Sequence, residues 1–114
     1  MIVDDDNDLS YILGLYVEKR GFITIGLSSI DRMLDKLREI SPDIIFLDNR
    51  LGDGLGINFI KQIKELCPET LVILMTADDL AELRLNDDFN SLDGILPKPF
   101  HLASVNEILS RLAA

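Results

Sequence analysis

The sequence lacks the features that would hold a protein in a membrane or stabilise it covalently. It contains one cysteine, Cys67, which cannot form an intrachain disulfide and suits a reducing compartment. Its apolar runs are short and are interrupted by charged residues, Gly or Pro, so none is long enough to span a bilayer. There is no signal-peptide pattern. We therefore expect a cytoplasmic protein that does not enter membranes.

Basic residues are also scarce. The chain has 11 Lys and Arg against 20 Asp and Glu, which gives a formal net charge of −9 at pH 7. A field of this sign repels the phosphate backbone of nucleic acids. The composition therefore argues against direct nucleic-acid binding by this chain and favours a cation or a basic partner.

The sequence shows no Gly/Ser-rich linker, low-complexity tract or internal repeat. Its 114 residues, of which 47% are hydrophobic and 27% charged, suit one globular domain over residues 1–114. The chain stops soon after its last apolar helical pattern. We therefore expect any output domain or downstream protein to lie outside this chain, and a homodimer is compatible with the sequence.

Short aliphatic or β-branched runs recur along the chain, each of a length that suits a buried strand. They are Ile2–Val3, Phe22–Ile25, Ile44–Leu47, Leu71–Met75 and Gly94–Leu96. Between them, apolar residues repeat at intervals of three and four, which is the spacing of an amphipathic helix. Helices are expected around residues 9–17, 30–40, 57–66 and 102–112. The acid-rich segment 79–89 is expected to form a further helix.

Strands that alternate with helices predict a parallel sheet, because parallel neighbours need long crossovers. Right-handed crossovers place helices on both faces of such a sheet. The expected fold class is therefore α/β, with a five-stranded, doubly wound parallel sheet. Ligands of these sheets bind beyond the carboxyl ends of the strands, so polar residues at those ends are candidates for a site.

Polar residues follow four of the predicted strands at their carboxyl ends. They are Asp4, Asp5 and Asp6 after the first strand, Asp48 after the third, Thr76 after the fourth and Lys98 after the fifth. Carboxylates gathered within a few ångströms repel one another unless a cation compensates them. Mg²⁺ prefers hard oxygen ligands, and Asp5 and Asp48 suit that role.

A carboxylate in this setting can also act as the nucleophile in phosphoryl transfer and form an acyl phosphate. The charge of the transferred group must then be neutralised on its equatorial oxygens. The metal, Lys98 and the hydroxyl of Thr76 are suited to this. Preorganised donors of this kind typically contribute on the order of 2 to 4 kcal/mol each.

The order and spacing of these motifs resemble the receiver-domain family of two-component response regulators over essentially the whole chain. The resemblance rests on Val3-Asp4-Asp5-Asp6, on Leu47-Asp48 continuing through Leu51, Asp53-Gly54 and Gly56, on Thr76-Ala77, and on Pro97-Lys98-Pro99-Phe100. The resemblance implies a flavodoxin-like sheet with strand order 2-1-3-4-5.

The resemblance also implies a role for each site residue. Asp48 would be the phosphoacceptor, and Thr76 and Lys98 would contact the phosphoryl group. Mg²⁺ would be held by Asp4, Asp5, Asp48 and the backbone carbonyl of Arg50. The phosphoryl donor would be a sensor histidine kinase or a histidine phosphotransfer protein. The domain would catalyse its own phosphorylation and dephosphorylation and would not turn over an external substrate. The peptide bond between Lys98 and Pro99 would be cis.

The sequence departs from the usual pattern of this family in several places. Ile95 stands where receivers usually carry the Tyr or Phe that moves together with the threonine. Ser91-Leu92 replaces the common Gly-Ala, and only Met1 to Val3 precede the acidic cluster. Arg50 and Asp78 lie two residues after Asp48 and Thr76, at positions that influence the access of hydrolytic water in this family. We therefore expect an altered acyl-phosphate lifetime.

Three other interpretations remain. Asp4-Asp5-Asp6 imitates the nucleophile motif of haloacid-dehalogenase-like phosphohydrolases, although Asp8 and the chain length argue against that class. A pseudo-receiver that binds partners without phosphorylation is the alternative that Ile95 favours. A structural interpretation makes Thr76 a helix cap and the acidic residues Asp4 to Asp6 a solvated helix start.

Asp53-Gly54 is expected to be structural, with Asp53 capping the helix that follows it.

Overall fold

Five parallel strands form the central sheet of the computed structural model, which describes residues 1–112. They are β1 (Ile2–Val3), β2 (Gly26–Leu27), β3 (Ile44–Asp48), β6 (Leu71–Thr76) and β7 (Gly94–Pro97), in the spatial order β2-β1-β3-β6-β7. Numbered among themselves, these strands have the order 2-1-3-4-5. The predicted fold class and strand order are therefore confirmed.

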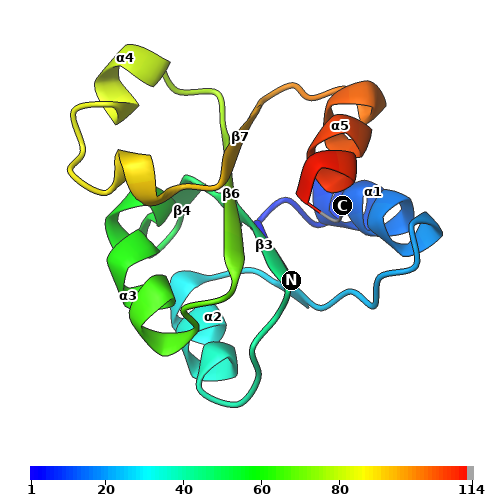
Figure 1. Cartoon of the computed structure of the whole chain (residues 1–114), viewed down its shortest axis with the longest axis horizontal. Helices are drawn as coiled ribbons and strands as arrows, with labels where there is room; N and C mark the ends of the chain where they lie inside the picture. Colours follow the sequence, from blue (N-terminus) through cyan, green and yellow to red (C-terminus); the bar gives the residue numbers. More distant parts are fainter. Residues whose placement is uncertain (113–114) are drawn as a thin grey trace.

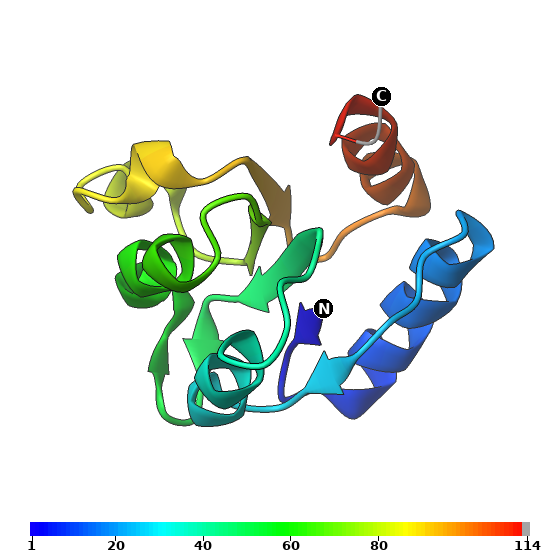
Figure 2. The same ribbon diagram turned by 60° about the horizontal axis from the view of Figure 1, so that its bottom comes forward.

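Helices cover both faces of the sheet (Figures 1 and 2). One face carries α1 (Asn7–Lys19) and α5 (Leu102–Leu112), and the other carries α2 (Ile30–Leu37), α3 (Ile60–Leu66) and the short α4 (Leu80–Leu83). Within residues 1–112, none of the helices combines the length and the apolar character needed to cross a bilayer.

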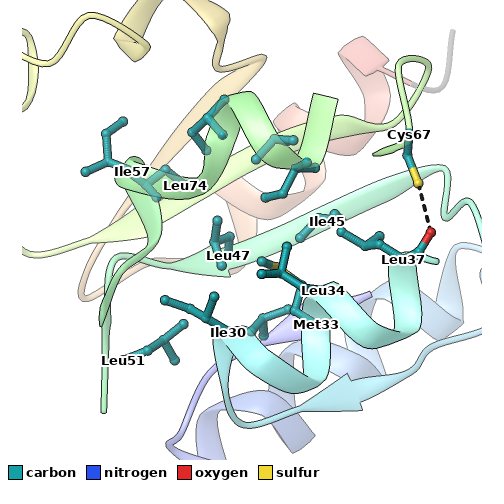
Figure 3. Close-up of a cluster of buried hydrophobic side chains, with 14 of the residues drawn as sticks. Ile30, Met33, Leu34, Leu37, Ile45, Leu47, Leu51, Ile57, Cys67 and Leu74 are labelled. Atoms are coloured by element: carbon teal, nitrogen blue, oxygen red, sulfur yellow. Dashed lines mark hydrogen bonds between the residues drawn. The ribbon is translucent and has the colours of Figure 1, made fainter. Parts of the chain in front are cut away.

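The sheet separates two hydrophobic cores because successive strand side chains point to opposite faces. From β3, Ile45 and Leu47 pack with α2 and α3, whereas Ile44 and Phe46 pack with α1 and α5. Figure 3 shows the first core, in which the thiol of the buried Cys67 donates a hydrogen bond to the Leu37 carbonyl. Burying each such aliphatic side chain contributes about 1.5–3 kcal/mol, so these residues hold the strand ends in fixed positions.

The second strand lies later in the chain than predicted. The apolar run Phe22–Ile25 is an irregular segment in which Ile23 is 94% exposed, and the strand is Gly26–Leu27. The partner strand β1 supplies only Ile2 and Val3, which pair with Gly26 and Leu27. Pairing with this short neighbour, rather than the position of the apolar run, decides which residues form the strand.

The helix predicted over residues 79–89 is largely wrong. Only α4 is α-helical there, and a 3₁₀ turn, η2 (Phe89–Ser91), follows after a stretch of turns. Leu83 is buried in this segment, but Leu85 is 83% exposed, so the segment lacks the continuous apolar face that would hold a longer helix to the sheet. Helix α2 likewise ends at Leu37, before Ile40, and the third helix begins as a 3₁₀ turn, η1 (Gly56–Phe59).

A two-stranded antiparallel hairpin follows β3 and was not predicted. It pairs β4 (Arg50–Leu51) with β5 (Gly54–Leu55). Gly54 has φ of +153°, which side-chain-bearing residues rarely adopt. At Gly56 a Cβ atom would lie 2.6 Å from the Asp48 carbonyl oxygen, so only glycine lets the chain pass this close to the end of β3.

Candidate functional site

The carboxyl ends of β1, β3 and β7 bring two carboxylates and one ammonium group together. The Nζ atom of Lys98 donates hydrogen bonds to Asp4 Oδ2 at 3.0 Å and to Asp48 Oδ1 at 3.2 Å. Asp4 and Asp48 are 2% and 6% exposed, so both charges lie largely out of water. The Lys98–Pro99 peptide bond is cis, as the resemblance implies.

Asp5 completes an acidic group with these two residues. Asp4, Asp5 and Asp48 each offer a carboxylate oxygen, and these oxygens lie within 4.8 Å of one another. We call Asp4, Asp5, Asp48 and Lys98 the acidic site. Three carboxylates face one ammonium group there, so the donor set has the hard oxygen ligands and the uncompensated charge that suit a divalent cation.

Burial and crowding raise the pKa of Asp48. Removal of the carboxylate from water is the largest cause, and the neighbouring charge of Asp4 adds to it, while the ammonium group of Lys98 lowers the pKa by less. For Lys98 itself, burial lowers the pKa, but the hydrogen bonds to Asp4 and Asp48 together with the charges of these two carboxylates outweigh it, and the net shift is upward. Lys98 is therefore held as a cation beside carboxylates that it does not fully compensate.

The two oxygens of Asp48 have different surroundings. Oδ1 accepts the hydrogen bond from Lys98 and a long one of 3.4 Å from the Arg50 backbone N–H. Oδ2 accepts no hydrogen bond from any of residues 1–112. One oxygen of this carboxylate is therefore positioned, and the other is available to a ligand or a reacting group.

Thr76 lies at the end of β6, but its hydroxyl is engaged elsewhere. It donates to Asp78 Oδ2 at 3.1 Å and accepts from the Asp78 backbone N–H at 2.8 Å. The guanidinium of Arg50 also binds Asp78, with Nε at 2.8 Å and Nη2 at 2.7 Å from Oδ1. The guanidinium group of Arg50 therefore forms an ion pair with Asp78.

Asn49 also binds Asp78, and the sequence alone did not identify it as a site residue. Its amide Nδ2 donates to Asp78 Oδ2 at 2.8 Å, and the residue is 2% exposed. We call Asp78, Arg50, Asn49 and Thr76 the Asp78 cluster. The hydrogen bonds from Arg50, Asn49 and Thr76 lower the pKa of Asp78. The feature of the sequence that could have identified Asn49 is an amide residue directly after the buried strand that ends at Asp48.

Asp53 caps a different helix from the one expected. Its two carboxylate oxygens accept hydrogen bonds from the backbone N–H groups of Ile30 and Asp31, both at 3.0 Å. These belong to the first turn of α2, which precedes Asp53 in the chain, and not to the helix that follows. The N–H bonds of Ile30 and Asp31 lower the pKa of Asp53. The residue is structural, as predicted, and it fastens the hairpin to α2.

Ile95 and Leu92 show what replaces the usual receiver residues. Ile95 is half-buried in β7, where it pairs with Leu74, and Leu92 packs against the core between the sheet and α3. Neither side chain can form a hydrogen bond. The movement of an aromatic ring that usually accompanies that of the threonine in receivers has no counterpart at Ile95.

The chain matches the model of the response regulator receiver domain over residues 1–110. It is 29% identical over 116 residues to the phosphate regulon transcriptional regulatory protein PhoB of Escherichia coli, covering 100% of this chain and 49% of PhoB. It is 28% identical to the DNA-binding transcriptional regulator NtrC of Proteus hauseri, covering 96% of this chain and 23% of NtrC. The chain therefore spans about half or less of these curated relatives.

Solved structures have the same fold. The beryllofluoride-activated NtrC4 receiver domain dimer superposes with a TM-score of 0.88 at 25% identity, covering 97% of this chain and 92% of that one. A two-component response regulator from Clostridium difficile gives 0.84 at 27% identity, covering 99% and 96%. With the family model spanning nearly the whole chain and a matching sheet order, the chain belongs to the response regulator receiver domain family.

Proposed function

We propose that this domain accepts a phosphoryl group on Asp48 from a phosphohistidine of a sensor histidine kinase or a histidine phosphotransfer protein. The observation that carries the proposal is the arrangement of Asp48 itself. One oxygen is fixed by Lys98, and the other accepts no hydrogen bond from residues 1–112. A carboxylate held in this way can present a single oxygen as the nucleophile.

The transfer forms a bond between Asp48 Oδ2 and phosphorus and breaks the bond between phosphorus and the histidine nitrogen. The ammonium group of Lys98, now shared by Asp4 and Asp48, would move part of its interaction to a phosphoryl oxygen. The Thr76 hydroxyl would leave Asp78 and donate a hydrogen bond to a second phosphoryl oxygen. Lys98 already bonds Asp48 before the transfer, whereas Thr76 must give up its bond to Asp78 before it can stabilise the charge of the phosphoryl group.

The acidic site fits a divalent cation, for which we propose Mg²⁺. Asp4, Asp5, Asp48 and the backbone carbonyl of Arg50 would hold it, and waters or phosphoryl oxygens would complete the coordination. When bound, the ion would neutralise charge on the phosphoryl group. The three carboxylates would also repel one another less, because the ion compensates the charge that Lys98 leaves unbalanced.

The domain would act as a signalling switch that phosphorylates and dephosphorylates itself and would not turn over an external substrate. PhoB and NtrC are at least twice as long as this chain, so we propose that an output domain or a downstream protein reads its state. With a net charge of −9, this domain would not itself contact nucleic acid. A homodimer is the proposed assembly, since NtrC4 forms one when activated.

A second candidate is a pseudo-receiver that binds partners without phosphorylation. Two observations favour it: the Thr76 hydroxyl is bonded to Asp78, and Ile95 cannot follow its movement as an aromatic residue would. The acidic site argues against this candidate. A domain that used only its surface would have no reason to keep two buried carboxylates around one lysine.

Intact-mass measurement after incubation with acetyl phosphate and Mg²⁺ tests the proposal. We expect a labile addition of roughly 80 Da that is lost in Asp48→Asn and in a Mg²⁺-free sample. The matched control is Asp43→Asn, which removes an exposed carboxylate just before β3, at the other end of the strand, and should leave the addition intact. No addition to the wild type, together with no binding of beryllofluoride, would favour the pseudo-receiver.

A further inference from the structure

Asn49 is a buried polar residue whose main-chain and side-chain polar groups are all used. Its backbone N–H donates to the Met75 carbonyl at 2.9 Å, and its backbone carbonyl accepts from the Gly56 N–H at 2.7 Å. Its side-chain oxygen accepts from the Ile57 N–H at 3.0 Å, and its side-chain nitrogen donates to Asp78 Oδ2 at 2.8 Å. A buried amide costs free energy unless it is paired, so its orientation is fixed by these partners.

The bond to Asp78 differs from the other three because it ends on a charged group next to Thr76. Asp78 Oδ2 accepts from both the Asn49 amide and the Thr76 hydroxyl, whereas Oδ1 accepts from Arg50. A threonine hydroxyl has one proton to donate. In this arrangement that proton is committed to Asp78, and donation to a phosphoryl group on Asp48 requires Thr76 to leave it.

We propose that Asn49 is a positioning residue that keeps Asp78 Oδ2 hydrogen-bonded while Thr76 turns toward the phosphoryl group on Asp48. The role rests on the proposed function, since it needs a group on Asp48 for Thr76 to reach. With Asn49 in place, Oδ2 retains one donor after the hydroxyl leaves. Without it, Thr76 is the only protein donor to this oxygen within residues 1–112, and its release leaves a half-buried carboxylate oxygen poorly satisfied.

Beryllofluoride, which mimics the phosphoryl group, provides the measurement. Its affinity in Mg²⁺ is determined by NMR titration for the wild type, Asn49→Leu, Asp78→Ala and the double variant. We expect Asn49→Leu to weaken binding about tenfold, since it strengthens the hold of Asp78 on Thr76. In the Asp78→Ala background Thr76 is already released, so adding Asn49→Leu should change the affinity little.

A purely structural role gives a different pattern. Asn49→Leu also removes the partner of the buried Ile57 N–H, and that loss is the same whether or not Asp78 is present. Equal weakening in both backgrounds, or no weakening in either, would overturn the proposal. Urea unfolding of all four proteins separates lost stability from lost affinity.

The wild type supplies a second readout that does not depend on a variant folding. The side-chain amide protons of Asn49 should stay protected from exchange with water when beryllofluoride binds, because the bond to Asp78 persists. Loss of protection on binding would overturn the proposal. If the wild type fails to bind beryllofluoride, both the phosphoacceptor function and the role of Asn49 are overturned. If the wild type binds it and Asn49→Leu leaves the affinity unchanged, only the role of Asn49 is overturned.

Discussion

The acidic site and the Asp78 cluster lie at the same edge of the sheet but balance charge in opposite ways. In the acidic site Asp4 and Asp48 share the ammonium group of Lys98 and Asp5 lies beside them, and burial together with the charge of Asp4 raises the pKa of Asp48. In the Asp78 cluster one carboxylate accepts from three side chains, and its pKa is lowered. Burial and a shortage of donors thus leave Asp48 able to bind a ligand, whereas three donors already satisfy Asp78.

The largest expected effect comes from removing the one cation of the acidic site. Lys98→Met leaves Asp4 and Asp48 buried without a partner, and breaking such a pair typically costs about 3 kcal/mol of the free energy of unfolding. The measurement is urea denaturation at pH 7 with a chelator present. Lys61→Met, which alters an exposed lysine of α3, is the control and should change the stability by less than about 0.5 kcal/mol. Equal effects of the two variants would mean that the acidic site is not short of positive charge.

Asp48→Asn is expected to change the stability in the opposite direction. A raised pKa means that the fold disfavours the charged form, so the neutral amide should raise the free energy of unfolding at pH 7 by about 1 kcal/mol without metal. The gain should shrink as the pH falls through the raised pKa of folded Asp48 and vanish well below the ordinary carboxyl pKa of about 4, where Asp48 is protonated in both the folded and the unfolded state. Chemical denaturation at both pH values tests this. A loss of stability at pH 7 would show that attraction to Lys98 exceeds the effects of burial and of Asp4.

The members of the acidic site could be predicted from the sequence because its geometry follows from topology. Once Asp4, Asp48 and Lys98 are assigned to the carboxyl ends of parallel strands, the sheet brings them together. The first core could be predicted for a similar reason, since helical spacing placed Ile30, Met33 and their neighbours on one face.

The Asp78 cluster could not be predicted, because its contacts depend on side-chain directions within loops. The sequence shows that Arg50 and Asp78 each lie two residues past a motif residue, but not that they pair with each other. The position of β2 and the shortness of α4 were missed for a related reason. β2 extends only over the two residues that pair with β1, and α4 stays short because Leu83 is its one buried side chain.

Asp53, in the hairpin that follows β3, tests whether saturation of a carboxylate by donors is stabilising in itself. Asp53→Ala removes the carboxylate that binds the first turn of α2, and loss of such a cap costs about 1 kcal/mol. Its pKa is lowered in the fold, so its contribution is complete above the ordinary carboxyl pKa of about 4 and is lost as the pH falls through the lowered value.

Urea midpoints of the wild type and Asp53→Ala should therefore converge in acid. Asp87→Ala removes an exposed acid from the segment after α4 and serves as the control, with no change expected at either pH. If the difference between wild type and Asp53→Ala persisted unchanged at low pH, the charge of Asp53 would have no part in fastening the hairpin to α2.

The smallest expected effect is that of Arg50→Met, although Arg50 forms the shortest ion pair at this edge. Its side chain is 73% exposed, so water and salt screen the attraction to Asp78. Asp78 also keeps the hydrogen bonds of Asn49 and Thr76, which satisfy its other oxygen. The urea midpoint should shift less than in Asp53→Ala, and the shift should shrink further in high salt. If Arg50→Met lowered the free energy of unfolding as much as Lys98→Met does, the Asp78 cluster would depend on its cation as much as the acidic site does. Burial, and not the number of donors, would then explain why the pKa of Asp48 is raised and that of Asp78 is lowered.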